Sequence, residues 1–255
     1  MKYVIGGIGD LLQTLEAATE EREIRVFSHY LNAPQFYKPF NVEIGFTRVE
    51  SAGDLDWVRP QLSSFEPLSR KMFLSLKPPT HFSAIARERL SRAPRRGQII
   101  GIHPVGSRFS NSVWMARGEP GKWLPVEFLE KLIVPENTYM LFGAREDLLQ
   151  YTRIASDHVL LICEENIWQS FAYAECCNYV IAVDSAIKSY AAMRNIPSIV
   201  LVVDYKDDFR DKMFLDPYGH SMSVIKFRRL DHDVLIKVKE IATKRFSRAG
   251  SARKH

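Results

Sequence analysis

The sequence predicts an α/β protein built on parallel β-sheet, and three observations carry that prediction. Over residues 97–203, short apolar runs alternate with segments of helical periodicity, which is the order of βαβ units. The run at 179–183 is apolar at every position, as in strands covered by helices on both faces. At the start of the chain, a β-type run at 3–5 leads through a glycine-rich turn into a helical pattern from Leu11, the first half of a further βαβ unit.

Each later element follows from a local pattern. The run at 24–27 is typical of a second strand, whereas residues 28–95 hold prolines at 34, 39, 60, 67, 78, 79 and 94, which predicts short helices and loops. Beyond a linker at 93–97, we expect strands at 99–102, 139–143, 159–162, 179–183 and 198–203, and helices at 125–132, 146–154, 167–174 and 189–194. The expected division is an N-terminal α/β domain at 1–94, a fuller C-terminal domain at 97–236 and a basic tail at 237–255.

The charge of the chain is concentrated at its end. Of the 255 residues, 46% are apolar and 25% charged, which excludes disordered, collagenous and coiled-coil chains. The net charge is +5, but residues 237–255 hold seven basic residues against one acid, and the rest holds 28 against 29. The tail is therefore either a disordered, solubilising segment or an electrostatic contact with nucleic acid or another anionic surface.

Several classes of protein are excluded by what the sequence lacks. No run reaches the roughly 18 apolar residues of a transmembrane helix, and three cysteines, two of them adjacent, do not form a disulfide framework. We therefore expect a cytoplasmic protein. The phosphate-loop pattern G-x-x-x-x-G-K-[ST], the zinc patterns H-E-x-x-H and paired C-x-x-C, and the hydrolase pattern G-x-S-x-G are all absent, so no metal site is predicted.

Polar residues follow four of the expected strands. They are Asp10, the loop His103–Arg108, the segment Gly143–Glu146, and Asp184 with Ser185. Ligands of open α/β sheets bind at the carboxyl ends of the strands, so these residues are the candidates for a site. Asp10 and Asp184 are equally placed to cap the helices that follow them.

The same residues carry a resemblance to a known family. Five segments resemble, in order and approximate spacing, those of the heptosyltransferases (glycosyltransferase family 9 type): Gly9–Ala17, His103–Ser107, Lys122–Pro125, Phe142–Glu146 and Val183–Pro197. The chain departs from the family pattern at Ala186, where the family has glycine, and at Ser189, where it has histidine. The resemblance implies a GT-B-like fold, in which two Rossmann-like parallel-sheet domains face a crevice, with the N-terminal domain reduced here.

The resemblance also implies a chemistry, namely metal-independent transfer of a sugar from a nucleotide-sugar donor to an acceptor hydroxyl. Asp10 is then the general base. The donor-binding residues it implies are Gly9, Ser107, Arg108, Lys122, Glu146, Asp184, Ser185 and Lys188. Lysine and arginine would neutralise the departing diphosphate, so that neither a metal nor a cofactor is needed besides the donor itself. The sequence fits two interpretations of Lys188 equally, a phosphate contact and a solvated surface lysine.

Two further functions stay open. One is a glycosyltransferase that acts on hydroxylated bases in DNA, so that the acceptor is a modified nucleobase rather than a carbohydrate. The basic tail at 237–255 and the short N-terminal half favour it. The other is a catalytically inactive module that keeps a GT-B nucleotide pocket, which Ala186 and Ser189 favour.

Overall fold

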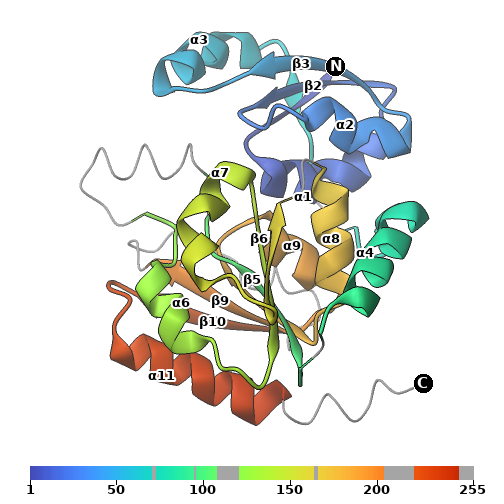
Figure 1. Ribbon diagram of the computed structural model, residues 1–255. Coiled ribbons are helices and arrows are strands. Elements are labelled where there is room, and N and C mark those ends of the chain that lie inside the picture. The colour runs from blue at the N-terminus through green and yellow to red at the C-terminus, as the bar shows by residue number, and fades with distance from the viewer. Residues whose placement is uncertain (71–72, 95, 108–120, 164–165, 204–220, 247–255) are drawn as a thin grey trace.

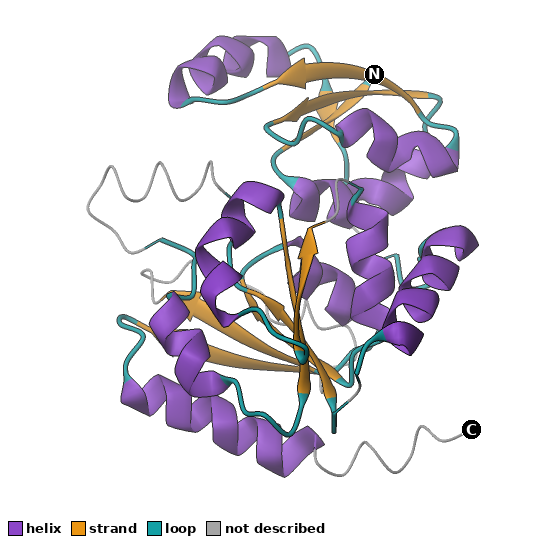
Figure 2. Ribbon diagram, viewed as in Figure 1, coloured by secondary structure: helices purple, strands orange, loops and turns teal. Residues whose placement is uncertain are grey.

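The computed structural model describes residues 1–255 except 71–72, 95, 108–120, 164–165, 204–220 and 247–255. Two parallel β-sheets lie one above the other in Figure 1, and Figure 2 shows helices packed around each of them. The predicted arrangement of two parallel-sheet α/β domains is confirmed, and the described residues form four strands in the N-terminal sheet and six in the C-terminal sheet.

The N-terminal sheet has the strand order β3-β2-β1-β4, and all its pairs are parallel. Its strands are β1 (Lys2–Ile5), β2 (Glu23–Ser28), β3 (Glu43–Arg48) and β4 (Glu66–Pro67), and its helices are α1 (Ile8–Thr19), α2 (Ala33–Tyr37), the 3-10 turn η1 (Lys38–Phe40) and α3 (Ala52–Leu62). Alternate strand residues face opposite sides. Val4 and Val26 pack with α1, whereas Phe27 packs with Val58 of α3 on the other face.

The C-terminal sheet has the strand order β7-β6-β5-β8-β9-β10, also fully parallel. Its strands are β5 (Ile99–His103), β6 (Thr138–Gly143), β7 (Val159–Cys163), β8 (Tyr179–Val183), β9 (Ser198–Val203) and β10 (Met222–Phe227). Its helices are α6 (Val126–Leu132), α7 (Arg145–Leu148), the 3-10 segment η2 (Leu149–Ile154), α8 (Ile167–Glu175), α9 (Ala186–Met193) and α11 (His232–Ile241). Numbered from β5, this is the 3-2-1-4-5-6 order of the Rossmann fold.

The strands expected after residue 97 are all present within one residue of their expected bounds. The helix expected at 146–154 is instead a single α-turn followed by a 3-10 segment. The helix expected at 189–194 begins earlier, at Ala186, because Ser185 already has the extended backbone of an N-cap residue. In the proline-rich part, β3 and the 11-residue helix α3 are more regular than the loops we expected there.

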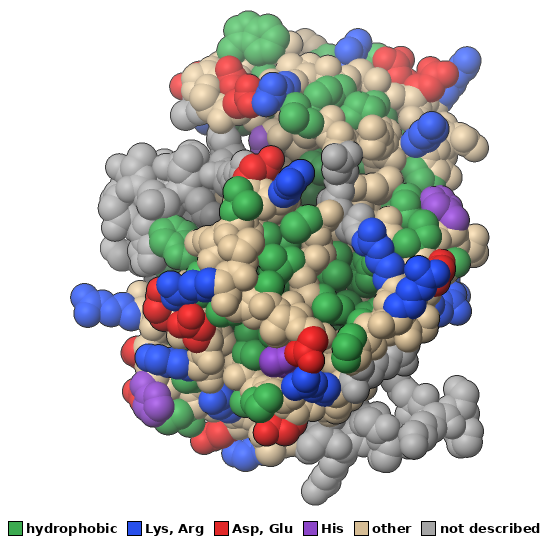
Figure 3. All heavy atoms as spheres, in the orientation of Figure 1, with side chains coloured by type: hydrophobic (Ala, Val, Ile, Leu, Met, Phe, Trp, Pro, Cys, Tyr) green, Lys and Arg blue, Asp and Glu red, His purple; other side chains and the backbone are tan. Residues whose placement is uncertain are grey.

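Helix α4 (Thr80–Arg92) connects the two sheets. It packs mainly against α8 of the C-terminal layer, as Figure 1 shows. The expected domain boundary at residues 94–97 follows α4 in the sequence. In the structure, however, α4 packs in the helix layer of the C-terminal sheet. Lys and Arg side chains gather over this part of the surface in Figure 3, where Arg87, Arg89 and Arg92 of α4 are exposed.

The helix layers of the two sheets share one apolar core. Helix α1 packs on α9. Trp168 of α8 is fully buried, stacks on Phe36 of α2 with ring centroids 5.2 Å apart, and donates its indole N–H to the Phe36 carbonyl at 3.2 Å. Leu11, Leu15 and Tyr190 belong to the same buried cluster. This contact fixes how the carboxyl ends of the two sheets meet.

The first half of the basic tail is helical, not disordered. Asp231 caps α11 by accepting the N–H of Val234 at 3.1 Å, and the apolar side of the helix packs on β10 and α6. The π-helical segment η3 (Ala242–Phe246) extends it. Among the described residues, no helix has the length and apolar character needed to cross a membrane.

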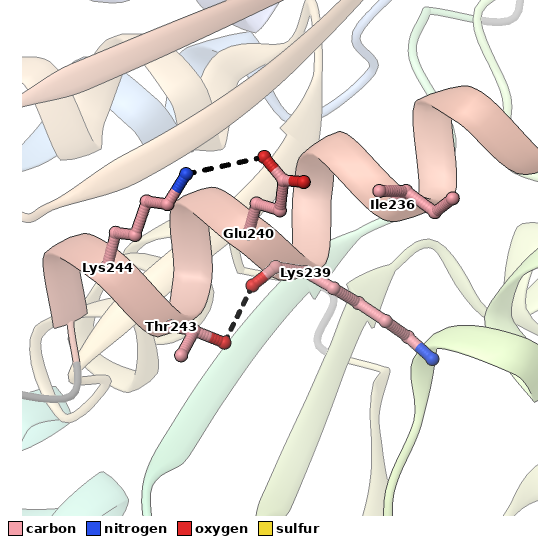
Figure 4. Close-up of a pocket in the computed structure, with 5 residues that line it drawn as sticks. All are labelled: Ile236, Lys239, Glu240, Thr243 and Lys244. Atoms are coloured by element: carbon pink, nitrogen blue, oxygen red, sulfur yellow. Dashed lines mark hydrogen bonds and ion pairs between the residues drawn. The ribbon is translucent and has the colours of Figure 1, made fainter.

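Helix α11 lies at the far end of the molecule from the N-terminal sheet (Figure 1). Its outer side carries a shallow depression of about 310 Å³, shown in Figure 4. Glu240 and Lys244 form an ion pair there at 3.5 Å, and the Thr243 hydroxyl donates to the Lys239 carbonyl at 2.8 Å. These contacts run along one helix, and the depression is remote from the strand ends where α/β sheets bind ligands.

Candidate functional site

The candidate site lies where the topological switch points of the two sheets face each other. In the C-terminal sheet the strand order reverses between β5 and β8, and in the N-terminal sheet between β1 and β4. Ligands of open α/β sheets bind in the space outside the carboxyl ends at this point. Gly9 after β1 faces Ala186 after β8, since a Cβ on Gly9 would lie 3.9 Å from the Ala186 Cα.

The loop after β5 is held by the segment that contains Lys122. The Gly106 N–H donates to the Lys122 carbonyl at 2.7 Å, and Val105 forms an antiparallel bridge with Trp123. A Cβ on Gly106 would lie 2.8 Å from the Lys122 Cβ and 3.3 Å from the Asp184 carbonyl oxygen. The glycine therefore lets the β5 loop, Lys122 and the end of β8 approach one another closely.

Lys122, Asp184 and Lys188 form a charged group that we call the lysine–aspartate cluster. One Asp184 oxygen accepts from the Lys122 ammonium at 2.7 Å, and the other accepts from the Lys188 ammonium, one helical turn along α9. Burial would raise the pKa of the Asp184 carboxyl, but the two ammonium groups outweigh it and hold this pKa well below its usual range. The cluster therefore carries a net charge of about +1 at neutral pH.

The structure contradicts one of the two expectations for Lys188. Its residue surface is only 3% exposed, so the alternative of a solvated surface lysine is wrong. Its ammonium lies on Asp184, which makes it an internal counter-ion of the strand end. Asp184 does not cap α9 through its side chain in the contacts described; the N-cap position belongs to Ser185.

Two buried polar atoms at these strand ends have no hydrogen-bond partner among the described residues. They are Nδ1 of His103, at the end of β5, and Oγ of Ser185, at the start of α9. Burial lowers the pKa of His103 to about 4, so its imidazole is neutral at pH 7. Because buried polar groups are normally paired, these two atoms are exceptions, and both lie at carboxyl ends of strands that face the N-terminal sheet.

Asp10 lies at the N-terminus of α1, on the other side of the site. Its Oδ2 accepts the N–H of Gly7, which is the N-cap residue, at 3.0 Å, so Asp10 caps α1 from the third position of the helix and not from the N-cap position. Its Oδ1 accepts from the Arg70 guanidinium at 2.9 Å, and Arg70 also donates to Gln13 at 3.3 Å. Arg70 follows β4, so this ion pair spans the switch point of the N-terminal sheet.

Direct hydrogen bonds join the two sides. Nε2 of His29, which follows β2, lies 3.1 Å from the Ser107 hydroxyl of the β5 loop. Deeper in the interface, the Gln13 amide lies 3.5 Å from the Ser189 hydroxyl of α9. Ser189 stands where the resembled family has histidine, and here it serves the contact between the two helix layers.

The remaining predicted residues are placed as follows. Gly9 lies in the contact between α1 and α9, with its hypothetical Cβ 4.0 Å from the Ser189 hydroxyl. Glu146 is exposed on α7, at the carboxyl end of β6. Arg108 lies outside the described residues. In the part of the chain that the structure describes, no group of three His, Cys, Asp or Glu residues is arranged to hold a metal ion.

Three residues of the site were not predicted from the sequence, namely His29, Arg70 and Gln13. His29 lies two residues after the strand predicted at 24–27 and directly after β2 as observed, and that position alone was a signal that could have identified it. Arg70 follows a strand of two residues that contains Pro67, too short for a pattern to reveal. Gln13 lies on an otherwise apolar side of α1 and is 8% exposed, which marks it as a buried polar residue only once the fold is known.

No protein-family model matches the chain, and no curated protein matches it in sequence. Solved structures do match over 96% of the chain. One is ADP-heptose lps heptosyltransferase II of E. coli, with 14% sequence identity, a TM-score of 0.58 and a match over 99% of that chain. Another is a family 9 glycosyl transferase of Veillonella parvula, with 12% identity, a TM-score of 0.53 and a match over 91% of that chain. The chain has the heptosyltransferase fold. A third match with this fold is E. coli heptosyltransferase WaaC with ADP, at 13% identity and a TM-score of 0.50 over 99% of that chain.

Proposed function

We propose that the protein is a metal-independent glycosyltransferase, which transfers a sugar from a nucleotide-sugar donor to an acceptor hydroxyl. The observation that carries the proposal is that a carboxylate and a cationic cluster follow the strand ends of the two sheets, which face each other where Gly9 approaches Ala186. Asp10 lies on the side of the N-terminal sheet, and the lysine–aspartate cluster lies on the side of the C-terminal sheet. The heptosyltransferase fold and the resemblance in five segments support the same proposal.

The C-terminal side would hold the donor. Cleavage of the bond between the anomeric carbon and the diphosphate leaves negative charge on the diphosphate, and preorganised donors stabilise it. The cluster supplies a net positive charge beside the N-terminus of α9, where backbone N–H groups favour anions. Ser107 and Lys122 then contact the diphosphate, and Lys188 acts through Asp184. One of the matching heptosyltransferases was solved with ADP, which supports a nucleoside diphosphate as the leaving group.

The N-terminal side would hold the acceptor. The acceptor oxygen forms the new bond to the anomeric carbon, and its proton passes to Asp10. Oδ1 is the oxygen available for this step, because its partner Arg70 is 55% exposed and exposed ion pairs contribute only about 0–1 kcal/mol. Oδ2 meanwhile keeps its hydrogen bond to Gly7, which holds the carboxylate in place.

The test compares Asp10→Asn with Asp54→Asn. Asp54 has the same capping role at the start of α3, where it accepts the Ser51 N–H at 2.8 Å, so this control reproduces the loss of a helix cap. The assay measures release of nucleoside diphosphate from a panel of nucleotide sugars, with carbohydrates and DNA carrying hydroxymethylated bases as acceptors. Asp10→Asn is expected to lower turnover by about 10²-fold or more, as loss of a general base does. Equal activity of both variants and the wild type would refute Asp10 as the base.

A second candidate is a nucleotide-binding module without turnover. The specific observation that favours it is that both oxygens of Asp10 are engaged, one by Gly7 and the other by Arg70. Calorimetry and the release assay together distinguish the two candidates. The binding module requires that nucleoside diphosphate binds and that no nucleotide sugar is cleaved with any acceptor. It also requires that Arg70→Ala, which frees Oδ1 of Asp10, does not start this cleavage.

A further inference from the structure

His29 lies at the contact between the two sides of the site, and the proposed function gives it no role. The turn that carries it is fixed on the glycine turn after β1. The Ser28 hydroxyl donates to the Gly6 carbonyl at 2.6 Å and accepts the Tyr30 N–H at 3.0 Å. The histidine between them is therefore held by its own backbone beside the N-terminus of α1.

The imidazole ring packs on the backbone at Gly7 and reaches across to the other sheet. A Cβ on Gly7 would lie 2.8 Å from the His29 Cε1, so the glycine makes room for the ring. Nε2 lies 3.1 Å from the Ser107 hydroxyl. Ser107 adjoins Gly106, whose hypothetical Cβ would lie 2.8 Å from the Lys122 Cβ. His29 is thus connected to the lysine–aspartate cluster through a single loop.

The protonation of His29 decides what the Ser107 hydroxyl can do. A hydroxyl has one proton to donate, together with lone pairs that accept. If Nε2 accepts, the Ser107 hydroxyl donates its hydrogen to the ring and cannot donate it to an anion. If Nε2 carries a proton and donates, the Ser107 proton can point at a phosphate oxygen. An anion bound at Ser107 therefore favours a ring with hydrogen on Nε2, which is either the neutral Nε2–H tautomer or the imidazolium. The negative charge of the anion favours the imidazolium of the two.

We propose that His29 belongs to the diphosphate site: it donates through Nε2 to Ser107 and takes up a proton when a nucleoside diphosphate binds. This inference rests on the proposed function, which places the diphosphate at Ser107. His29 is then a positioning residue that acts through Ser107 and adds positive charge to the site only while the anion is present.

The surroundings of the ring fit this behaviour. Burial lowers the pKa of His29, whereas the charge of Asp10 opposes that effect, so the ring of the free protein is neutral at pH 7. Arg70 offsets part of the Asp10 charge from the N-terminal side, and Lys122, Asp184 and Lys188 lie beyond Gly106 on the other. A bound diphosphate brings additional negative charge and raises the pKa of the ring.

The experiment is calorimetry of ADP, UDP and GDP binding at pH 7 in buffers of different ionisation enthalpy, which measures protons taken up on binding. Because the phosphate itself titrates, the comparison is between the wild type and His29→Gln, with the exposed His232→Gln as matched control. The wild type and His232→Gln are expected to take up a larger fraction of a proton than His29→Gln. Affinity at pH 6.5 should fall about tenfold in His29→Gln, as for a lost charge-assisted hydrogen bond.

Ser107→Ala provides a second variant, because it removes the hydroxyl but keeps the ring. It is expected to lower the proton uptake toward that of His29→Gln. If a nucleoside diphosphate binds and all these variants take up the same number of protons, the role of His29 is refuted while the proposed function stands. If no nucleoside diphosphate binds to the wild type, both are refuted.

Discussion

Replacing Asp184 by asparagine removes the carboxylate that two lysines share. The Lys188 side chain is only 4% exposed, whereas those of Lys122 and Asp184 are 18% and 29% exposed. The substitution keeps the size of the side chain but leaves a buried ammonium without this counter-charge. It tests whether the lysine–aspartate cluster holds the strand ends together, independently of any activity.

The expected cost follows from the burial. Removing one partner of a buried ion pair costs about 3–5 kcal/mol. Because Asp184 and Lys122 are reached by water, we expect the lower end, about 3 kcal/mol at pH 7. For a chain of this size that lowers Tm by roughly 6–12 °C. The double variant Asp184→Asn with Lys188→Met removes the buried ammonium together with its carboxylate partner and should recover to within about 1 kcal/mol of the wild type.

The sign of the pH dependence is also determined. The folded pKa of Asp184 lies well below its usual range, so its contribution is present above the unfolded pKa of about 3.9 and is lost as the pH falls through the folded pKa. The difference between the wild type and Asp184→Asn should therefore shrink below about pH 4.

Urea unfolding at pH 7 and at pH 3.5 measures these differences, with Asp157→Asn as control. Asp157 is 51% exposed and pairs with Arg96, and a surface pair of this kind contributes at most about 1 kcal/mol. A loss below about 1 kcal/mol in Asp184→Asn, or a double variant no more stable than the single one, would refute the account of the cluster.

Two further predictions concern stability. Trp168→Ala should cost about 3–5 kcal/mol in urea unfolding because the ring is fully buried against Phe36. Trp168→Phe, which keeps a ring and loses the indole hydrogen bond, should cost markedly less, and equal costs would contradict this. Since the pKa of His103 is lowered to about 4, the unfolded chain binds the extra proton between about pH 6.5 and 4. Stability should decrease by up to about 3 kcal/mol as the pH falls through that range, and an unchanged pH slope in His103→Gln would refute it.

The parts of the fold that could be predicted from sequence are those with strong local patterns. The strand at 179–183 is buried at every position, and an apolar run that ends in Asp184 indicated both the strand and the residues after it. Strand β3 lies at the edge of its sheet and is only half-buried. At Gly45, the absence of a side chain leaves room for the Arg25 side chain of β2. Its sequence therefore carries a weak pattern.

Helix α11 was not predicted from the sequence, because its second half lies in the basic segment 237–255. Lys237 and Lys239 belong to its polar side, whereas Val234, Leu235 and Val238 are buried. The net charge of residues 237–255 indicates a solvated tail, whereas the spacing of Val234, Leu235 and Val238 is that of an amphipathic helix.

The candidate site could be predicted only in part, because it is assembled from segments far apart in the chain. Asp184 and Lys188 are one helical turn apart, and their pairing follows from local geometry. His29 and Ser107 are separated by 78 positions, and Asp10 and Arg70 by 60. Such pairs depend on which strand ends the topology brings together, and no local pattern contains that information.

The apolar core shared by α1, α2, α8 and α9 has a consequence for folding and for substrate exchange. Separating the two halves would expose Trp168, Phe36 and Leu15 to water together. We therefore expect each half to be less stable alone, and both sheets to unfold in one cooperative transition. Substrates are therefore expected to enter and leave while the halves stay joined, through local rearrangement of side chains at the strand ends.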